Sequence, residues 1–287
     1  MHSPASGKPF AGSTRDRRVV LCADDYAQTL GTIDGILALL AAARLSAVSC
    51  LVESPLWPEA ARRLRELPGA FDAGLHFNLT HDFSGARAHR PAALPLMLIC
   101  AGLRVLSRSE IGACLHRQLD RFEQEMARPP DFVDGHQYIH QLPVVRDVLV
   151  SVLRHRYAPA PPAIRVTVPS ESRGLKGALI AHLGGYGLLK TLRRERIPHN
   201  LDFAGIYDFT RAAGFAERMT RWLAGVRDGG LIVSHPARSG PSGSDPIAGA
   251  REREFAYLGS DSFASTLRNS CVRLARFRDL PASAGSI

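Results

Sequence analysis

The chain has 287 residues, of which 45% are apolar and 22% charged, and its formal net charge is +9. This apolar content can bury a large core, which excludes wholesale disorder. No apolar run approaches the roughly 18–20 residues of a membrane span, and the first 18 residues lack the apolar segment of a secretory signal. The five cysteines form no CxxC pair, which argues against a disulfide framework and a cysteine-built zinc site. We therefore expect a soluble, cytoplasmic, globular protein.

The positive charge comes mainly from arginines spread along the chain rather than from a basic block. Aromatic residues are not interleaved with them as in a single-strand binder, so no nucleic-acid partner is predicted. Solvated arginine-rich faces explain the charge. An anionic partner, such as a phospholipid surface or a lipid-linked sugar, stays open.

Short apolar segments typical of strands alternate with helical patterns along the chain. The expected strands are Arg18–Ala23, Ser46–Val52, Ala73–Leu79, Phe132–Val133, Ala163–Val168, Phe203–Tyr207 and Leu231–Val233. Helices are expected over about 29–43, from the Ser107-x-x-Glu110 capping box to Pro129, and over about 142–154.

About seven strands separated by helices predict an α/β fold of parallel βαβ units, either a covered sheet or a closed barrel. No linker divides the chain, so a single domain is expected over 17–278, with flexible tails at 1–16 and 279–287. Two segments, roughly 81–106 and 236–250, have the composition of insertions and follow histidines closely. They are candidate lids for substrate selection.

Polar residues capable of binding metal recur where the expected strands end. Asp24 and Asp25 follow the first strand and His76 lies in the third. Asp134, His136 and His140 follow the fourth strand, and His235 ends the last. Ligands gather at the carboxyl ends of parallel strands, so these groups would meet at one face and suit a divalent ion. The pattern favours a metal-dependent hydrolase.

Each of these residues also has a purely structural explanation. Asp24 and Asp25 could form a turn that caps the next helix, and His76 could be a hydrogen-bonded core histidine. His136 and His140 are four residues apart with no glutamate between them at the usual zinc-motif position, which is a weak zinc signal. His235 precedes a proline and could simply end a strand.

The same residues carry a resemblance to a known family. ADDY (23–26), GLHFNLT (74–80), DGHQYIHQLP (134–143) and SHP (234–236) resemble the motifs of the YdjC-like (ChbG/HpnK) carbohydrate deacetylases, in order and spacing over about residues 17–260. Arg165 resembles the strand-borne arginine of that family, and Arg253-Glu254 the run that follows its His-Pro. Residues 202–208 are similar to a segment of the hopanoid-associated branch.

The resemblance implies a deformed (β/α) barrel that removes acetyl groups from N-acetylated sugars with a divalent cation, usually Mg²⁺, with Zn²⁺ also open. By matched position, Asp25, His76 and His136 would hold the metal. Asp24 would be the general base and His235 a candidate general acid. Such an ion polarises the amide carbonyl and lowers the pKa of bound water, while a carboxylate takes the proton.

The resemblance also suggests supporting roles for the surrounding residues. Asp134 would orient a histidine ligand. Gln137, Tyr138, His140 and Arg165 would either support the metal-binding and catalytic residues or contact the sugar. The family commonly has a histidine where this chain has Tyr138, so the substrate subsite is expected to differ.

Substrate and partners stay open between several alternatives. The substrate would be an N-acetylglucosamine-type oligosaccharide or a glycolipid, and a homodimer is compatible with the sequence. The stretch 175–196 has leucines at helical spacing and a basic end, which fits a core helix or peripheral contact with the inner face of a membrane. Rival functions are another metal hydrolase, acting on a phosphoester or glycosidic bond, and a non-catalytic basic surface-binding protein.

Overall fold

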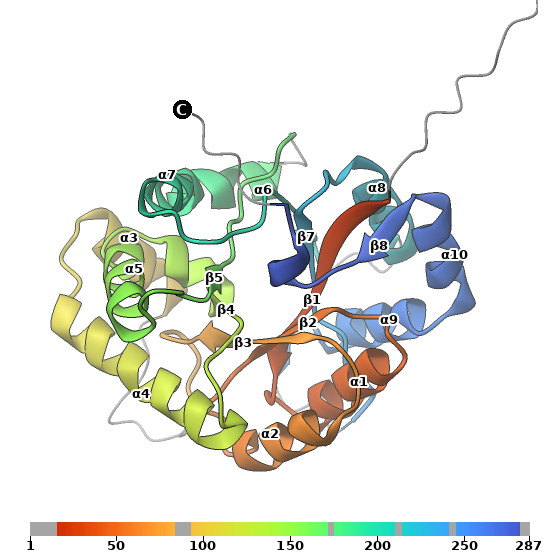
Figure 1. Ribbon diagram of the computed structural model, residues 1–287, viewed down its shortest axis with the longest axis horizontal. Helices are drawn as coiled ribbons and strands as arrows, with labels where there is room; N and C mark the ends of the chain where they lie inside the picture. The colour runs from red at the N-terminus through yellow and green to blue at the C-terminus, as the bar shows by residue number, and fades with distance from the viewer. Residues whose placement is uncertain (1–15, 84–92, 172–174, 210–213, 241–244, 282–287) are drawn as a thin grey trace, which may run out of the picture.

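The computed structural model describes residues 16–83, 93–171, 175–209, 214–240 and 245–281. In these ranges, parallel strands form one sheet that curls into an incomplete barrel surrounded by helices (Figure 1). The strand order is β5-β4-β3-β2-β1-β7-β6, with β8 paired to β1. This architecture confirms the predicted α/β fold with about seven parallel strands in a deformed barrel.

The strands span β1 (Arg17–Tyr26), β2 (Ala47–Cys50), β3 (Asp72–Phe77), β4 (Phe132–Gly135), β5 (Ala163–Ile164), β6 (Asp202–Ala204), β7 (Gly230–Ser234) and β8 (Val272–Leu274). The first helices are α1 (Leu30–Ala41), α2 (Trp57–Glu66), α3 (Leu94–Gly102), α4 (Arg108–Met126), η2 (His136–Gln141) and α5 (Val145–Arg156). They are followed by α6 (Leu175–Ile180), η3 (Ala181–Gly185), α7 (Tyr186–Glu195), α8 (Phe215–Gly225), α9 (Ala248–Leu258), α10 (Asp261–Asn269) and η4 (Phe277–Asp279).

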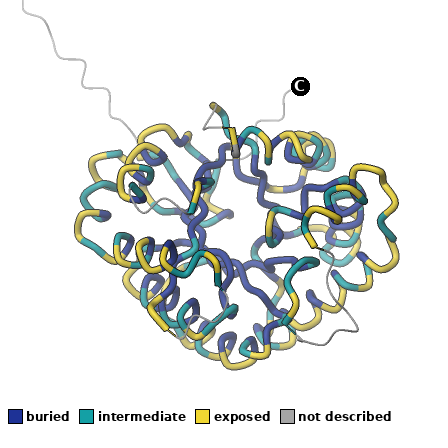
Figure 2. Tube along the Cα trace, turned by 180° about the vertical axis from the view of Figure 1, so that it is seen from behind, coloured by how far each residue is buried: buried dark blue, intermediate teal, exposed yellow. Residues whose placement is uncertain are grey.

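Alternating side chains divide the apolar core into two parts. Residues such as Leu21 and Leu75 face outward from the strands and pack against the helices in the larger cluster. Val20, Cys22 and Phe132 belong to a separate small cluster that fills the inside of the barrel. Figure 2 shows the structure from behind, with the buried trace concentrated in the strands and the exposed trace on the outer helices.

The two end strands of the sheet, β5 and β6, are bridged by a few hydrogen bonds to the segment before β6 instead of a strand ladder. The described residues of β5 and β6 form no ladder with each other, and the segment after β5 reaches Asn200 instead. The Asn200 side chain accepts from the Val166 amide and donates to the Val166 carbonyl, each at 2.8 Å. This arrangement satisfies backbone groups that would otherwise be buried without partners.

Several helical expectations match the structure, with local differences. Ser107 caps α4, accepting a hydrogen bond from the Glu110 amide at 3.3 Å. Thr29 caps α1, so the interpretation of Asp24 and Asp25 as its cap is wrong. The stretch 175–196 is broken by a π-helical turn at η3, where Gly184 has φ 148 and lies against the Gln141 carbonyl.

Other sequence expectations are met only in part. The expected insertion 81–106 contains α3, but its residues 84–92 lie outside the described ranges. Residues 241–244 of the second expected insertion and most of both expected tails also lie outside them. β8 was not predicted, because three residues with one exposed arginine carry too little apolar pattern. Within the described ranges, no helix combines the length and apolar character needed to cross a membrane. A cytoplasmic location and a homodimer stay predictions.

Candidate active site

A cavity of about 730 Å³ opens at the carboxyl ends of the strands. The sequence-predicted residues that line it are Asp24, Asp25, His76, His136, Gln137, Tyr138 and His235. Asp134, His140 and Arg165 lie behind this wall, each fully buried. The fold therefore gathers the predicted residues from four strand ends into one place.

Asp24 and Asp25 both reach this cavity although they are neighbours on β1. Successive side chains of a regular strand point to opposite faces. Here the β1–β2 register shifts between Ala23 and Tyr26, and Asp25 adopts a left-handed conformation with φ 64. This irregularity turns both carboxylates to the inside of the barrel, where they take different partners.

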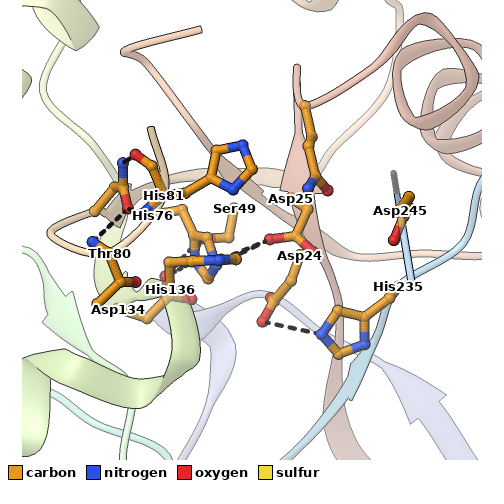
Figure 3. Close-up of polar contacts among 12 residues, drawn as sticks. Asp24, Asp25, Ser49, His76, Thr80, His81, Asp134, His136, His235 and Asp245 are labelled. Carbon is orange, nitrogen blue, oxygen red and sulfur yellow. Dashed lines mark hydrogen bonds and ion pairs between the residues drawn. The ribbon is translucent and has the colours of Figure 1, made fainter. Parts of the chain in front are cut away.

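Asp25 forms a compact cluster with the two predicted histidine ligands (Figure 3). Its Oδ1 lies 3.0 Å from Nδ1 of His136 and 3.4 Å from Nε2 of His76. One ligand atom from each residue lies within 4.8 Å of the others. Burial alone would raise the pKa of Asp25, but the charge of Arg251 and hydrogen bonds from both histidines hold that pKa well below its usual range.

The second ring nitrogen of His76 is held by residues of the two neighbouring strands. His76 Nδ1 lies 2.6 Å from Oδ1 of Asp134 and 2.9 Å from the hydroxyl of Ser49, which also donates to Asp134. Burial lowers the pKa of His76, but the charges of Asp134 and Asp24 outweigh it and raise that pKa to about 10. A carboxylate behind a histidine is the arrangement that orients metal-binding imidazoles.

Asp24 is held by Arg165 instead. Arg165 Nη1 and Nη2 donate to the two Asp24 oxygens at 2.7 and 2.6 Å. Nη2 also lies 2.5 Å from Asp134 and 3.1 Å from Cys22 Sγ. Cys22, Asp24 and Asp134 also lie within metal-binding distance of one another, but the guanidinium already occupies the space between them. This second group is therefore an ion-pair network and not a candidate metal site.

Arg251 of α9 supports the other oxygen of Asp25. Its Nη2 donates to Asp25 Oδ2 at 2.8 Å and to Gln28 at 2.7 Å, and its Nε donates to Asp245 at 2.7 Å. Arg251 is only 3% exposed, and burying a guanidinium is costly unless it is paired in this way. Asp25 is thus left with one carboxylate oxygen facing the histidines.

His235 lies across the cavity from the histidine pair. Its Nε2 is 4.0 Å from Asp24 Oδ2, and its buried Nδ1 has no hydrogen-bond partner among the described residues. Burial lowers the pKa of His235 to about 4, so the ring is neutral at pH 7. Glu254 accepts from the His235 amide and from the Tyr207 hydroxyl, both at 2.5 Å.

The segment after β4 separates His136 from His140. A regular helix would place residues four apart on one face, but Gln137 and Tyr138 have φ values of 54 and 61. His136 therefore faces Asp25, while His140 turns away and its Nε2 lies 3.0 Å from the Arg165 carbonyl. Gln137 and Tyr138 line the cavity beside the cluster.

Sequence reasoning missed several residues of this site. They are Ser49, His81, Gln28, Asp245 and Arg251. Ser49 gives no signal because a serine in a strand is ordinary, and an arginine on a helix is usually solvated. His81 lies near His136 with ring centroids 5.8 Å apart, and its place after an expected strand was the one usable clue.

Two curated relatives have names that bear on the chemistry. The chain is 30% identical to a mouse protein named carbohydrate deacetylase over 148 residues, which is 48% of this chain and 47% of the relative. It is 26% identical to a Yersinia pestis protein named chitooligosaccharide deacetylase over 156 residues, 50% of this chain and 58% of the relative. The chain spans about half the length of the curated relatives it matches.

Solved structures extend the likeness in fold to nearly the whole chain. An Enterococcus faecalis protein named for cellobiose-phosphate cleavage matches with a TM-score of 0.70 at 17% identity, over 92% of this chain and 98% of its own. A peptidoglycan N-acetylglucosamine deacetylase matches with a TM-score of 0.50 at 12% identity, over 98% of this chain and 100% of its own. At these identities the likeness concerns the fold alone.

The motifs that suggested a family are scattered from β1 to α9, and the fold brings them together in one cavity. The family model described as YdjC-like protein matches residues 18–269, which include every site residue named above. The hopanoid-associated branch stays a prediction. The chain belongs to the YdjC-like family.

Proposed function

We propose that this protein is a metal-dependent hydrolase that removes the acetyl group from N-acetylated sugars. The observation that carries the proposal is that two adjacent acids in one cavity, Asp24 and Asp25, have different contacts. Asp25 faces His76 and His136, whereas Asp24 is held by Arg165 and faces His235. The names of the mouse and Yersinia relatives, each a carbohydrate or chitooligosaccharide deacetylase, support the same reaction.

The donor set of the cluster fits a divalent cation. Asp25, His76 and His136 would hold it, because one carboxylate oxygen and two imidazole nitrogens converge within 4.8 Å. Such an ion supplies Lewis-acid polarisation of the amide carbonyl and a more acidic water. Two imidazoles suit Zn²⁺ better than Mg²⁺, which prefers oxygen ligands, so both ions need to be compared.

Asp24 is the group best placed to act as general base. It is an acceptor with two oxygens, and Arg165 fixes the plane of its carboxylate through both of them. Asp24 lines the cavity beside the cluster, so a water molecule held there can pass its proton to the carboxylate. The clamp by Arg165 keeps Asp24 oriented without contributing a proton itself, because a guanidinium stays charged.

His235 follows β7, the strand next to β1, and faces Asp24 so that it can complete the proton path. Its Nε2 is 4.0 Å from Asp24 Oδ2, and its ring is neutral at pH 7 because burial lowers the pKa to about 4. A neutral imidazole can receive the proton that Asp24 has taken and then donate it to the departing amine. His235 thus serves as an acid that is charged only during turnover.

The sugar would lie along the part of the wall formed by Gln137, Tyr138 and His81. Gln137 offers an amide to sugar hydroxyls, and the Tyr138 ring offers a flat face as well as a hydroxyl. The substrate is either an N-acetylglucosamine-type oligosaccharide or the same sugar on a lipid.

The test is acetate release by the 287-residue chain, stripped of metal and then supplied with Zn²⁺, Mg²⁺, Mn²⁺ or Co²⁺ separately. Chito-oligosaccharides and N-acetylglucosaminyl lipids are the substrates. We expect cation-dependent acetate that is lost in Asp24→Asn and retained in Asp34→Asn, an aspartate of α1 that pairs with Arg63 on the surface. Acetate that persists in Asp24→Asn would overturn the assigned base. Release of phosphate or reducing sugar in place of acetate would support the rival hydrolases.

A further inference from the structure

Large apolar side chains are exposed mainly on two segments of this chain. Ten large hydrophobic residues are exposed in the described ranges, and eight of them belong to these segments. We call the eight residues the apolar rim: Leu96, Ile99, Leu103, Val105, Leu175, Leu179, Leu183 and Tyr186. Single exposed leucines need no explanation, but a cluster of this size does.

The α3 helix is apolar on every side. Met97 and Ala101 face the core, and Leu94 and Leu98 line the cavity. The third stripe, Leu96, Ile99 and Leu103, is 54%, 59% and 70% exposed. A helix that is apolar all round is normally buried in a core or in a membrane, yet this one lies at the surface.

The second segment, α6 to α7, carries another row of exposed apolar side chains beside the cavity. Leu175, Leu179, Leu183 and Tyr186 follow one another at helical spacing and are 92%, 59%, 37% and 49% exposed. Leu179 and Leu183 also line the cavity, so both halves of the apolar rim border the same opening.

Basic side chains continue outward from both halves of the rim. Lys190, Arg193 and Arg194 are exposed on α7, where Glu195 is the one acid and pairs with Arg194. After α3, the exposed Arg104 and Arg108 share one acid, Asp147, at 3.9 and 3.4 Å. Apolar side chains bordered by cations are the pattern of a surface that enters the interface of an anionic bilayer.

We propose that the apolar rim docks on the surface of an anionic lipid bilayer, with α3 and the α6–α7 segment inserted among the headgroups and the cavity opening toward them. A second copy of the chain fits this surface less well. A two-fold contact would set each basic border against a like-charged one and would cover the opening of the cavity. The inference concerns where the protein lies and does not require the proposed reaction.

The experiment is co-sedimentation of the 287-residue chain with vesicles. One set is phosphatidylcholine alone, and the other is equal parts of phosphatidylcholine and phosphatidylglycerol. We expect the wild-type chain to pellet with the anionic vesicles and less so as salt is raised. The triple variant Ile99→Ser, Leu103→Ser and Tyr186→Ser, which spares every cavity residue and adds no charge, should bind at least about tenfold more weakly.

Matched controls separate docking from general damage. Leu201→Ser changes an exposed leucine before β6, at the opposite end of the strands, and should pellet like the wild type. Arg193→Gln with Arg194→Gln should weaken binding to the anionic vesicles on the order of tenfold, whereas the exposed Arg221→Gln on α8 should not. All variants should release acetate from a soluble chito-oligosaccharide like the wild type.

Three results would overturn the proposal. The first is a wild-type chain that pellets with neither vesicle, and the second is a triple variant that pellets as well as the wild type. The third is a wild-type dimer in light scattering that the triple variant abolishes, which would assign the rim to a second copy. Retained vesicle binding without acetate release would count against the proposed reaction alone.

Discussion

Arg165 grips both oxygens of Asp24, with Nη1–Oδ2 at 2.7 Å and Nη2–Oδ1 at 2.6 Å, and all of these atoms are buried. The same guanidinium reaches Asp134, which in turn holds His76. One cation therefore connects the proposed base with the support of a proposed metal ligand. A change at Arg165 should disturb both.

Replacing Arg165 should separate the effect of charge from that of geometry. Arg165→Lys keeps the positive charge but loses the bidentate hydrogen bonding to Asp24, so we expect kcat to fall with little change in KM. Arg165→Met leaves Asp24 and Asp134 buried without the cation they share and should lower the free energy of unfolding by about 3–5 kcal/mol. Steady-state kinetics and urea unfolding measure the two effects. A lysine variant with wild-type kcat would refute the positioning role.

Cation binding should depend on the three residues that face one another in the cluster. A saturating cation stabilises the folded chain through mass action, by about 2.7 kcal/mol at a hundredfold excess over Kd. We expect Zn²⁺ to raise Tm more than Mg²⁺ at equal concentration, because two of the three ligands are imidazoles. His136→Ala should abolish the shift. His155→Ala, an exposed histidine of α5, should keep it. An equal shift in both variants would mean that the cation binds elsewhere.

His235 should matter for turnover more than for binding. His235→Gln keeps a polar side chain of similar length but cannot exchange a proton, so kcat should fall by about 10²–10⁴ with little change in KM. Acetate release with saturating substrate measures the loss. Because Glu254 holds the His235 backbone amide and not its ring, the fold around β7 should be preserved. A variant that loses activity only through a raised KM would point to a substrate contact instead.

Glu254 should make stability depend on pH. Burial raises its pKa to about 7 from the ordinary 4.5 of a glutamate, despite the hydrogen bonds from Tyr207 and His235. As the pH rises from about 4.5, the unfolded chain loses this proton first, so the Glu254 contribution to stability falls until about pH 7. Above and below this window its contribution is constant.

Glu254→Gln removes this pH dependence because an amide does not titrate. The Tm difference between wild type and Glu254→Gln should shift in favour of the variant between pH 4.5 and 7. Glu252→Gln, an exposed neighbour on α9, should run parallel to the wild type at every pH. If the curve of Tm against pH for Glu254→Gln also runs parallel to that of the wild type, Glu254 titrates at its ordinary pKa in the folded chain.

The sequence by itself was enough to predict the fold class and to name several polar residues of the candidate site. Short apolar segments separated by helical patterns favour parallel strands covered by helices, and parallel strands place their carboxyl ends at one face. Asp24, Asp25, His76, His136 and His235 could be named for this reason, since each lies at or just after a strand. Local pattern and chain direction suffice for that inference.

Only the tertiary structure decided which partner each of those residues contacts. No spacing in the sequence shows that Arg165 pairs with Asp24 and Arg251 with Asp25. Arg251 and Asp25 are 226 residues apart along the chain. The left-handed turns at Asp25 and at Gln137 also have no local signal, yet they bring both acids into the cavity and turn His140 out of it. Partners of this kind are chosen by packing between distant segments, because a buried charge is stable only where the fold supplies its opposite.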